Sequence, residues 1–195
     1  MALKRFRIVK PEIRVLGVDD GVFIPHRKGL ALVVGVVFRG GYWLDGVMHT
    51  QIEVDGLDAT ERIASMILGS PHHKQLRVII LNGVTFAGFN VIDVRRLSED
   101  TGLPVITVTR GKPNFDEIRE ALVNLPDGDK RWKLILNLGE PFEMSTRKIC
   151  EKIYVQVFGT RREDAEKIVR LTSTRSNIPE ALRVAHLIAS GITNA

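Results

Sequence analysis

Apolar and polar positions in the first third of the chain follow the two-residue period that is typical of β-strands. The stretch EIRVLGVDD (12–20) alternates and then ends in two acids, which predicts a strand of about six residues. A valine-rich run (30–40) predicts a second strand buried on both faces, and segment 41–56 predicts a third. Because Gly40 and Gly41 leave room only for a tight turn, we expect these strands to form a three-strand antiparallel meander.

The period changes after residue 56, where apolar residues recur at three and four positions, as in amphipathic helices. Four segments predict helices on this pattern: 57–70, 89–102, 114–125 and 130–139. Two short continuous apolar runs between them predict buried parallel strands: 75–83 and 103–110. A final strand and two helices follow at 153–159, 162–173 and 178–191.

This order of elements predicts an α/β fold. A meander followed by alternating strands and helices gives a mixed sheet with helices on both faces. The first and fourth strands should lie side by side at its centre, because a crossover connection joins parallel neighbours. The chain has 195 residues, and we find no internal repeat or linker, so we expect a single domain over 1–195.

Composition narrows the functional classes. The net charge of +5 and the pI of about 9.6 permit an anionic partner such as nucleic acid. Cations cluster in three places, each of which could equally be a solvated surface: Lys4, Arg5, Arg7 and Lys10; Arg27 and Lys28; and Arg161 and Arg162. Cys150 is the only cysteine, which excludes internal disulfides and cysteine-rich zinc sites. No apolar stretch has the length of a signal peptide or a membrane span, so we expect a cytoplasmic protein without a membrane partner.

Polar side chains end three of the predicted strands. Asp19 and Asp20 close the first, Asp55 closes the third, and Asn82 closes the fourth. In sheets of this kind, ligands gather at the carboxyl ends of the parallel strands, and Mg²⁺ prefers oxygen ligands. We therefore predict a Mg²⁺ site at Asp19, Asp55 and Asn82, with Asp20 as a further catalytic residue. Asp19 and Asp20 must point to opposite faces of their strand, so at most one can be aimed at a given site.

Several of these residues also have an ordinary structural interpretation. Asp55 lies in the sequence VDG, which is typical of a turn. Asp58, followed three residues later by Glu61, is typical of a helix N-cap. His186 falls within the last helix, where a histidine is most often packed or capping.

Other residues are candidates for nucleic-acid contacts. Arg27 and Lys28 follow the paired aspartates, and Arg175 precedes the last helix, where it could bind a phosphate or form a buried ion pair. Gly88 permits close backbone approach of an anion in the loop GVTFAGFN (83–90), although the phenylalanines of this loop could simply fill the core.

Five stretches carry a resemblance to a known family. RVLGVDDG, GLDATERI, LRVIILNGVTFAGFNVIDV, TGLPVITVTRGKP and SNIPEALRVAHLIASG resemble an uncharacterised, mainly archaeal family described as endonuclease V-like. The resemblance covers nearly the whole chain, as one endonuclease V-like domain. It implies a ribonuclease H-like fold, acidic residues that hold Mg²⁺, and cleavage of nucleic acid near deaminated adenine. By the same resemblance Asp19 corresponds to the first catalytic aspartate and Asn82 to a later one, whereas Asp55, Asp58 or Glu61 occupies the region of the glutamate.

The chain also departs from endonuclease V. LNG at 81–83 places a neutral amide where the enzyme has a carboxylate. The stretch leading to IEVDG lacks the tyrosine-proline-glycine wedge, and VTFAG replaces a basic histidine-proline-arginine segment. Loss of one carboxylate predicts weaker Mg²⁺ binding and poorer stabilisation of developing charge. The departures argue against specific cleavage at deaminated bases.

Three functions follow, in this order. The first is a nucleic-acid-binding protein that has this fold and a weakened or altered divalent-metal site. The second is an active Mg²⁺-dependent endonuclease for DNA or RNA. The third is a small-ligand or scaffold protein that forms a homodimer through its second and third strands.

Overall fold

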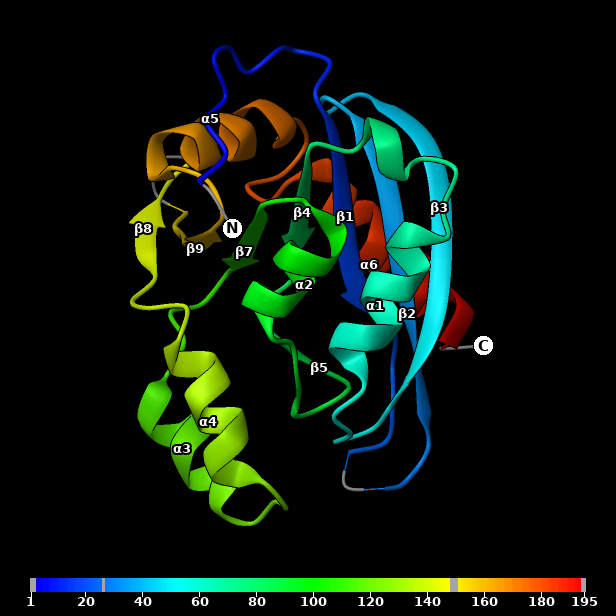
Figure 1. The fold of residues 1–195 in the computed structure, drawn as a ribbon, viewed down its shortest axis with the longest axis vertical. Helices are drawn as coiled ribbons and strands as arrows, with labels where there is room; N and C mark the ends of the chain where they lie inside the picture. The colour runs from blue at the N-terminus through cyan, green and yellow to red at the C-terminus, as the bar shows by residue number, and fades with distance from the viewer. Residues whose placement is uncertain (1–2, 26, 148–150, 194–195) are drawn as a thin grey trace.

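A mixed β-sheet forms the centre of the protein (Figure 1). The computed structural model describes residues 3–25, 27–147 and 151–193, so Cys150 lies outside it. The strands of the main sheet are β1 (Arg14–Asp20), β2 (Leu30–Arg39), β3 (Trp43–Glu53), β4 (Val78–Leu81), β7 (Val105–Thr109), β8 (Phe142–Met144) and β9 (Ile153–Phe158). Their spatial order is β3-β2-β1-β4-β7-β9-β8.

Helices and a small hairpin complete the fold. The helices are α1 (Ala59–Leu68), the 3₁₀ helix η1 (His73–Gln75), α2 (Val94–Thr101), α3 (Phe115–Val123), α4 (Gly128–Leu136), α5 (Arg162–Thr172) and α6 (Glu180–Thr193). The hairpin consists of β5 (Thr85–Phe86) and β6 (Asn90–Val91).

The pairing of the strands confirms the predicted topology. β1, β2 and β3 form the antiparallel meander, and β2 is buried along almost its whole length. β1 pairs parallel with β4, and β4 pairs parallel with β7. β9 then adds antiparallel to β7, and β8 antiparallel to β9. The parallel strands β1 and β4 therefore lie at the centre of the sheet, as the crossover rule requires.

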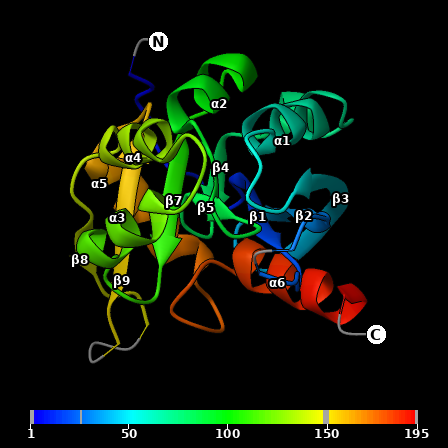
Figure 2. The same ribbon diagram turned by 90° about the horizontal axis from the view of Figure 1, so that it is seen from below.

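Helices cover both faces of the sheet (Figure 2). On β1, Leu16 and Val18 belong to the core that includes residues of α1 and α2. Val15 points the other way, into the core formed with α5 and α6. The two-residue period of the strand thus assigns each of its side chains to one helix layer.

The hairpin of α3 and α4 packs on the loop that contains β5 and β6. Leu122 and Ile135 meet Val91 in a small separate core. The rings of Phe115 and Trp132 contact edge to face, with 6.2 Å between their centroids. This core fixes the loop that follows β4.

Several elements differ from the sequence prediction, which contained neither the β5–β6 hairpin nor the 3₁₀ helix η1. The helix expected over 89–102 begins at Val94, because residues 90–91 pair with residues 85–86 and the Asp93 side chain caps the helix through the Arg96 amide. β8 was not predicted, since three residues are too few for a recognisable period.

Candidate functional site

Asp19 and Asp20 end β1 on opposite faces of the sheet. Asp19 points to α6, where it contacts His186. Asp20 points to the other face and accepts a hydrogen bond from the Ala87 amide. The adjacent carboxylates therefore have different hydrogen-bond partners, although the charge of Asp19 still acts on Asp20.

The Asp19 carboxylate joins strand β4 and helix α6. Its Oδ1 accepts hydrogen bonds from Asn82 Nδ2 at 3.0 Å and from the Asp20 amide at 3.0 Å. Its Oδ2 lies 3.1 Å from His186 Nδ1. The Asp19 side chain is 3% exposed, whereas that of His186 is 54% exposed and Asn82 is also exposed. A buried acid thus lies beneath two accessible side chains.

Burial raises the pKa of Asp19 above its ordinary value. The hydrogen bonds from Asn82 and from the Asp20 amide, followed by the charge of His186, act in the opposite direction without cancelling the effect of burial. The ionised carboxylate is therefore short of compensating positive charge, which a bound cation would supply.

Gly17 explains how α6 comes so close to β1. A Cβ atom on this residue would lie 2.3 Å from the backbone carbon of Ala181 and 2.5 Å from the backbone nitrogen of Leu182. The absence of a side chain lets the start of α6 lie directly against the strand. Further along α6, His186 then lies beside Asp19.

Asp20 and Asp55 hold the loop between β4 and α2. Asp20 Oδ2 accepts from the Ala87 amide at 2.6 Å, and Asp55 Oδ1 accepts from the Phe89 amide at 2.8 Å. The amide of Asp55 donates in turn to the carbonyl of Ala87 at 2.9 Å. The structure therefore brings Asp55 together with Asp20 through this loop, while Asp19 makes its contacts on the other face of the sheet.

Gly88 lies against the carboxylate of Asp55. A Cβ at Gly88 would approach Asp55 Oδ1 to 2.3 Å, and its φ of 86° favours glycine. Asp55 and Ala87 also have positive φ angles, of 53° and 45°. Such angles are uncommon outside glycine, and the two carboxylate contacts offset their cost. The nucleic-acid contact of Gly88 stays a prediction.

Asp20 makes stability depend on pH. Burial, together with the nearby charge of Asp19, raises its pKa from 3.8 to about 6, against the effect of the hydrogen bond from Ala87. Between these two values the folded protein binds more protons than the unfolded chain, so stability falls as pH rises through this range. We expect Asp20→Asn to raise the free energy of unfolding at pH 7.5 by about 1–2 kcal/mol, because it removes the half-buried charge and keeps an acceptor for Ala87.

Urea unfolding at pH 4 and pH 7.5 checks this prediction. The gain from Asp20→Asn should nearly disappear at pH 4, where Asp20 is protonated in the folded protein. Asp129→Asn, at an exposed position of α4, serves as the control and should change stability little at either pH. An equal gain from Asp20→Asn at both pH values would contradict the assignment.

Lys28 and Asp55 line a common hollow. It has a volume of about 470 Å³ and lies between the β1–β2 connection and the turn that ends β3. Arg27, next to Lys28, is exposed, and its amide donates to the carbonyl of Ile24. Two of the predicted contact residues thus accompany the Asp55 loop and not the Asp19 group.

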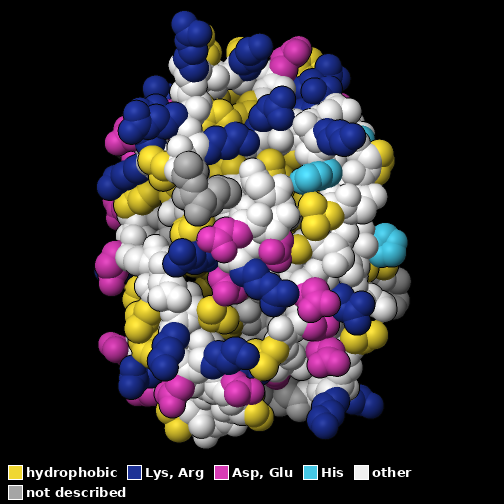
Figure 3. All heavy atoms as spheres, in the orientation of Figure 1, with side chains coloured by type: hydrophobic (Ala, Val, Ile, Leu, Met, Phe, Trp, Pro, Cys, Tyr) yellow, Lys and Arg dark blue, Asp and Glu magenta, His cyan; other side chains and the backbone are white. Residues whose placement is uncertain are grey.

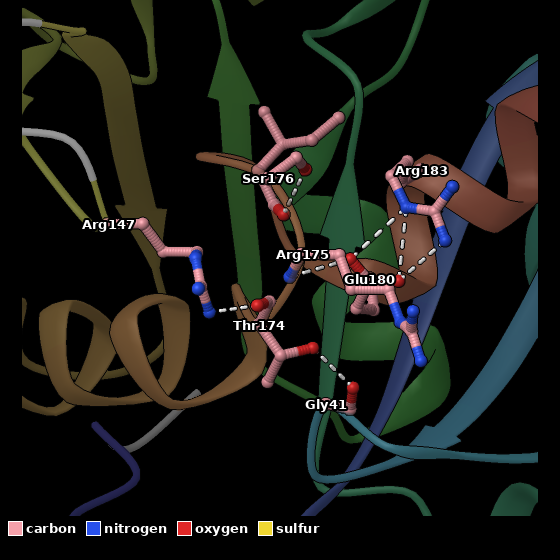
Figure 4. Close-up of polar contacts among 8 residues, drawn as sticks. Gly41, Arg147, Thr174, Arg175, Ser176, Glu180 and Arg183 are labelled. Atoms are coloured by element: carbon pink, nitrogen blue, oxygen red, sulfur yellow. Dashed lines mark hydrogen bonds and ion pairs between the residues drawn. The ribbon is translucent and has the colours of Figure 1, made fainter.

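Arg175 lies in the loop between α5 and α6 (Figure 4). Its side chain is exposed, and its amide donates to Glu180 Oε1 at 3.2 Å. Glu180 forms its ion pair with Arg183 within the first turn of α6, where Arg183 Nη2 lies 2.8 Å from Glu180 Oε2. Thr174 bonds to the carbonyl of Gly41, so the loop packs on the β2–β3 turn. That turn adjoins the start of β1, and the structure does not bring Arg175 into contact with Asp19.

Asp58 precedes α1, but its side chain does not cap the helix. Its Oδ1 instead accepts hydrogen bonds from the Glu53 amide and from Asn90 Nδ2, at 3.1 and 2.7 Å. Asn90 Oδ1 accepts a hydrogen bond from the amide of Ala59, the first residue of α1, at 3.0 Å. The predicted cap is thus wrong in detail, because the fully buried side-chain amide of Asn90, 32 residues after Asp58, takes its place.

His186 is the residue of this site that sequence reasoning missed. It follows Ala185, which is buried on the α6 face that packs on the sheet. The sequence placed His186 within the last helix, but its partner on the strand depends on how α6 docks at Gly17. Only the structure supplies that relation.

Two absences hold for the part of the chain that the structure describes. No group of three or more His, Cys, Asp or Glu side chains there is arranged to hold a metal ion. Within the same residues, no helix is long and apolar enough to cross a membrane.

Comparison with known proteins places this geometry in a family. The profile of the family described as Endonuclease dU matches residues 11–193. A UPF0215 protein of Methanosarcina mazei is 52% identical over 185 residues, which span 95% of this chain and 93% of the relative. The resemblance inferred from the sequence motifs is therefore confirmed.

Solved structures agree on the fold. A protein of unknown function from Archaeoglobus fulgidus has a TM-score of 0.82 at 38% identity, over 92% of this chain and 98% of that one. Endonuclease V of Ciona intestinalis, solved with a 24mer DNA that contains an inosine followed by a ribo-adenosine, has a TM-score of 0.62 at 15% identity, over 93% of this chain and 86% of that one. The predicted ribonuclease H-like fold, a mixed sheet flanked by helices, is thus confirmed.

Proposed function

We propose a function from the premise that this chain belongs to the Endonuclease dU family: it binds nucleic acid and hydrolyses phosphodiester bonds slowly, through an altered divalent-metal site. One observation carries this proposal. Asp19, Asn82 and His186 come from three separate elements and meet at the carboxyl ends of the central parallel strands. This is the edge at which sheets of this class bind their ligands.

The chemistry of these side chains fits one divalent cation with few protein ligands. Asp19 supplies the carboxylate, and its raised pKa reflects a buried charge that lacks compensation. The Asn82 amide nitrogen is used by Asp19, so its carbonyl oxygen is the atom available to a cation. The exposed imidazole of His186 completes the set. When bound, Mg²⁺ or Mn²⁺ neutralises charge that develops on the phosphodiester and lowers the pKa of water.

We expect this site to be weaker than one built from three acids. Asn82 is neutral, and the Asp20 and Asp55 carboxylates accept hydrogen bonds from the Ala87–Phe89 loop on the other face. Our predicted set of Asp19, Asp55 and Asn82 therefore becomes Asp19, Asn82 and His186 in this proposal. Asp20 and Asp55 act as positioning residues for the loop.

The proposal also concerns which nucleic acid and which modified base the protein cleaves. Endonuclease V of Ciona intestinalis was solved with inosine-containing DNA, and the description of this family names dU. The missing wedge and basic segment argue against strict selection of a deaminated base. Deoxyuridine and deoxyinosine are therefore the modified bases to compare with unmodified DNA and RNA.

The test is cleavage of these oligonucleotides with Mg²⁺ or Mn²⁺. We expect Asp19→Asn to lower the rate by about 100-fold, since it removes the central anionic ligand. Asp100→Asn, on the exposed side of α2, is the matched control and should cleave like the unaltered protein. Equal rates for Asp19→Asn and the unaltered protein would overturn the assignment of the site.

A second candidate function is binding without cleavage. It is favoured by the absence of a group of three metal-binding side chains among the described residues. In that case oligonucleotides bind to both the unaltered protein and Asp19→Asn, and neither protein cuts them.

A further inference from the structure

The N-terminal segment 4–10 carries four cations and is fixed to the body of the protein. The amide of Lys4 donates to the carbonyl of Gly159 at 2.8 Å, and Thr160 Oγ1 donates to the carbonyl of Lys4 at 2.7 Å. The amide of Phe6 donates to Asp164 Oδ2 at 3.2 Å. These contacts tie the segment to the end of β9 and the start of α5, so its side chains form a defined surface.

Two hollows lie on either side of this segment, with Ile8 common to both. The first has a volume of about 360 Å³, and its cationic residues are Lys10, Arg14 and Arg77. The second, more open, has a volume of about 640 Å³, and its cationic residues are Arg7, Lys167 and Arg170. Figure 3 shows Lys and Arg side chains gathered around apolar surface on this part of the molecule, at the top of the view.

Little negative charge balances these cations. Glu12 is the one acid among the residues that line the two hollows. Asp164, close by, is already engaged by Arg161 at 3.0 Å. Arg7, Lys10 and Lys167 are exposed and form no close ion pair with another described residue, although the charge of Lys167 acts on Asp164 from further away. The surface therefore presents unpaired positive charge.

The surroundings of Lys4 show the same excess of positive charge. Burial, together with the nearby charge of Arg77, lowers the pKa of its ammonium group. Its Nζ donates to the carbonyl of Arg77 at 3.4 Å, which neutralises no charge. Anionic groups in the adjoining hollow would relieve this repulsion.

We propose that this N-terminal basic surface, formed by segment 4–10 with Arg77, Lys167 and Arg170, binds the phosphate backbone of nucleic acid. The inference rests on the proposed function for its class of partner, but it uses none of the residues of the candidate site. Asp19 lies at the far end of β1, roughly 17 Å along the strand from Arg14. The surface thus adds affinity for nucleic acid without selecting a sequence, while the site at Asp19 acts on the bound nucleic-acid strand.

The shape of the surface favours a nucleic-acid backbone over a lipid membrane. The cations line two neighbouring concave hollows, and successive phosphates of a strand can occupy adjacent depressions. A membrane-binding amphipathic helix inserts a free apolar face. Segment 4–10 is not helical, and the apolar face of α5 is already buried in the core through Ala165, Ile168 and Val169. Binding of this kind releases counterions and depends steeply on salt.

The experiment measures binding of a short fluorescent DNA duplex over a series of salt concentrations, in EDTA so that no cleavage occurs. One variant combines Arg7→Gln, Lys10→Gln and Lys167→Gln. The matched control combines Arg62→Gln, Arg95→Gln and Arg96→Gln, which removes the same charge from α1 and α2. Each of these three control arginines already pairs with an acid four residues before or after it: Arg62 with Asp58, Arg95 with Glu99 and Arg96 with Asp100. Denaturation curves establish that both variants are folded.

We expect the first variant to bind at least tenfold more weakly at low salt, and its log–log salt slope to fall by about 2 to 3. The control should stay within about threefold of the unaltered protein, because its arginines offer little unpaired charge. Equal weakening in both variants would show an effect of net charge alone and overturn the inference.

Two further arms separate this inference from the proposed function. If Asp19→Asn loses binding while the Arg7, Lys10 and Lys167 variant keeps it, the duplex binds at the candidate site, and only the inference fails. If the unaltered protein binds no duplex or single strand, both fail. If the Arg7, Lys10 and Lys167 variant loses binding to phosphatidylserine vesicles but still binds the duplex, the surface binds lipid and the inference is wrong.

Discussion

Gly17→Ala is expected to lower the free energy of unfolding by about 3 kcal/mol or more and to abolish cleavage at the same time. The added methyl group would lie 2.3 Å from the backbone of Ala181, and a helix backbone cannot yield as a flexible side chain does. α6 must therefore move away from β1, which opens the core between them. His186 moves with the helix and loses its position beside Asp19.

Guanidinium chloride unfolding and the cleavage assay together check this prediction. Gly191→Ala is a control in the same helix, since a methyl group there meets no atom within 4 Å. That change should leave cleavage intact and stabilise the protein by up to about 0.5–1 kcal/mol, because alanine favours the helix over glycine. If Gly17→Ala were as stable and active as the unaltered protein, the proposed docking of α6 would be wrong.

Arg131→Met is expected to cost about 3–5 kcal/mol of stability. The guanidinium is buried, and it donates to the carbonyls of Pro126 at 3.1 Å, Gly56 at 2.8 Å and Asp55 at 2.8 Å, and also to that of Phe89. Methionine fills the space but leaves four carbonyl groups without these donors. Arg131 connects α4 to the turn after β3 and to the loop after β4, so all three should loosen together.

Denaturation gives the size of this loss, and hydrogen exchange shows where it occurs. Amides of residues 85–91 should lose protection in Arg131→Met, whereas those of α6 should lose less. Arg131→Lys should recover only part of the stability, because one ammonium group cannot reach all four carbonyls. Lys130→Met, at the exposed neighbouring position, should change stability by less than about 0.5 kcal/mol, and an equal effect at both positions would contradict this account.

The central architecture could be predicted from the sequence because it depends on local periods and on chain topology. Alternation identified β1, continuous apolar runs identified β2, β4 and β7, and the short Gly40–Gly41 turn required the meander. Parallel pairing of β1 with β4 followed from the rule that a crossover connection joins parallel neighbours. These rules act on every chain of this type, whatever its individual side chains.

Residues of the candidate site could be predicted only where the order of the strands alone determines their position. Asp19 and Asn82 end neighbouring strands, and they are indeed in contact. Asp55 was expected beside them, but its carboxylate contacts the Ala87–Phe89 loop. Both Asp55 and Ala87 have positive φ although neither is glycine, so the conformation of this turn and loop could not be read from the sequence. His186 depends on the docking of a helix 167 residues away in sequence, which no local pattern encodes.

The cap that Asn90 provides for α1 has a consequence for the order in which the protein forms. Ala59 emerges from the ribosome 31 residues ahead of Asn90. Until Asn90 emerges, the first turn of α1 in the nascent chain therefore lacks this acceptor and frays. Once Asn90 emerges, its amide closes the helix, binds Asp58 and anchors the new loop in one event. Helix and loop thus mature together.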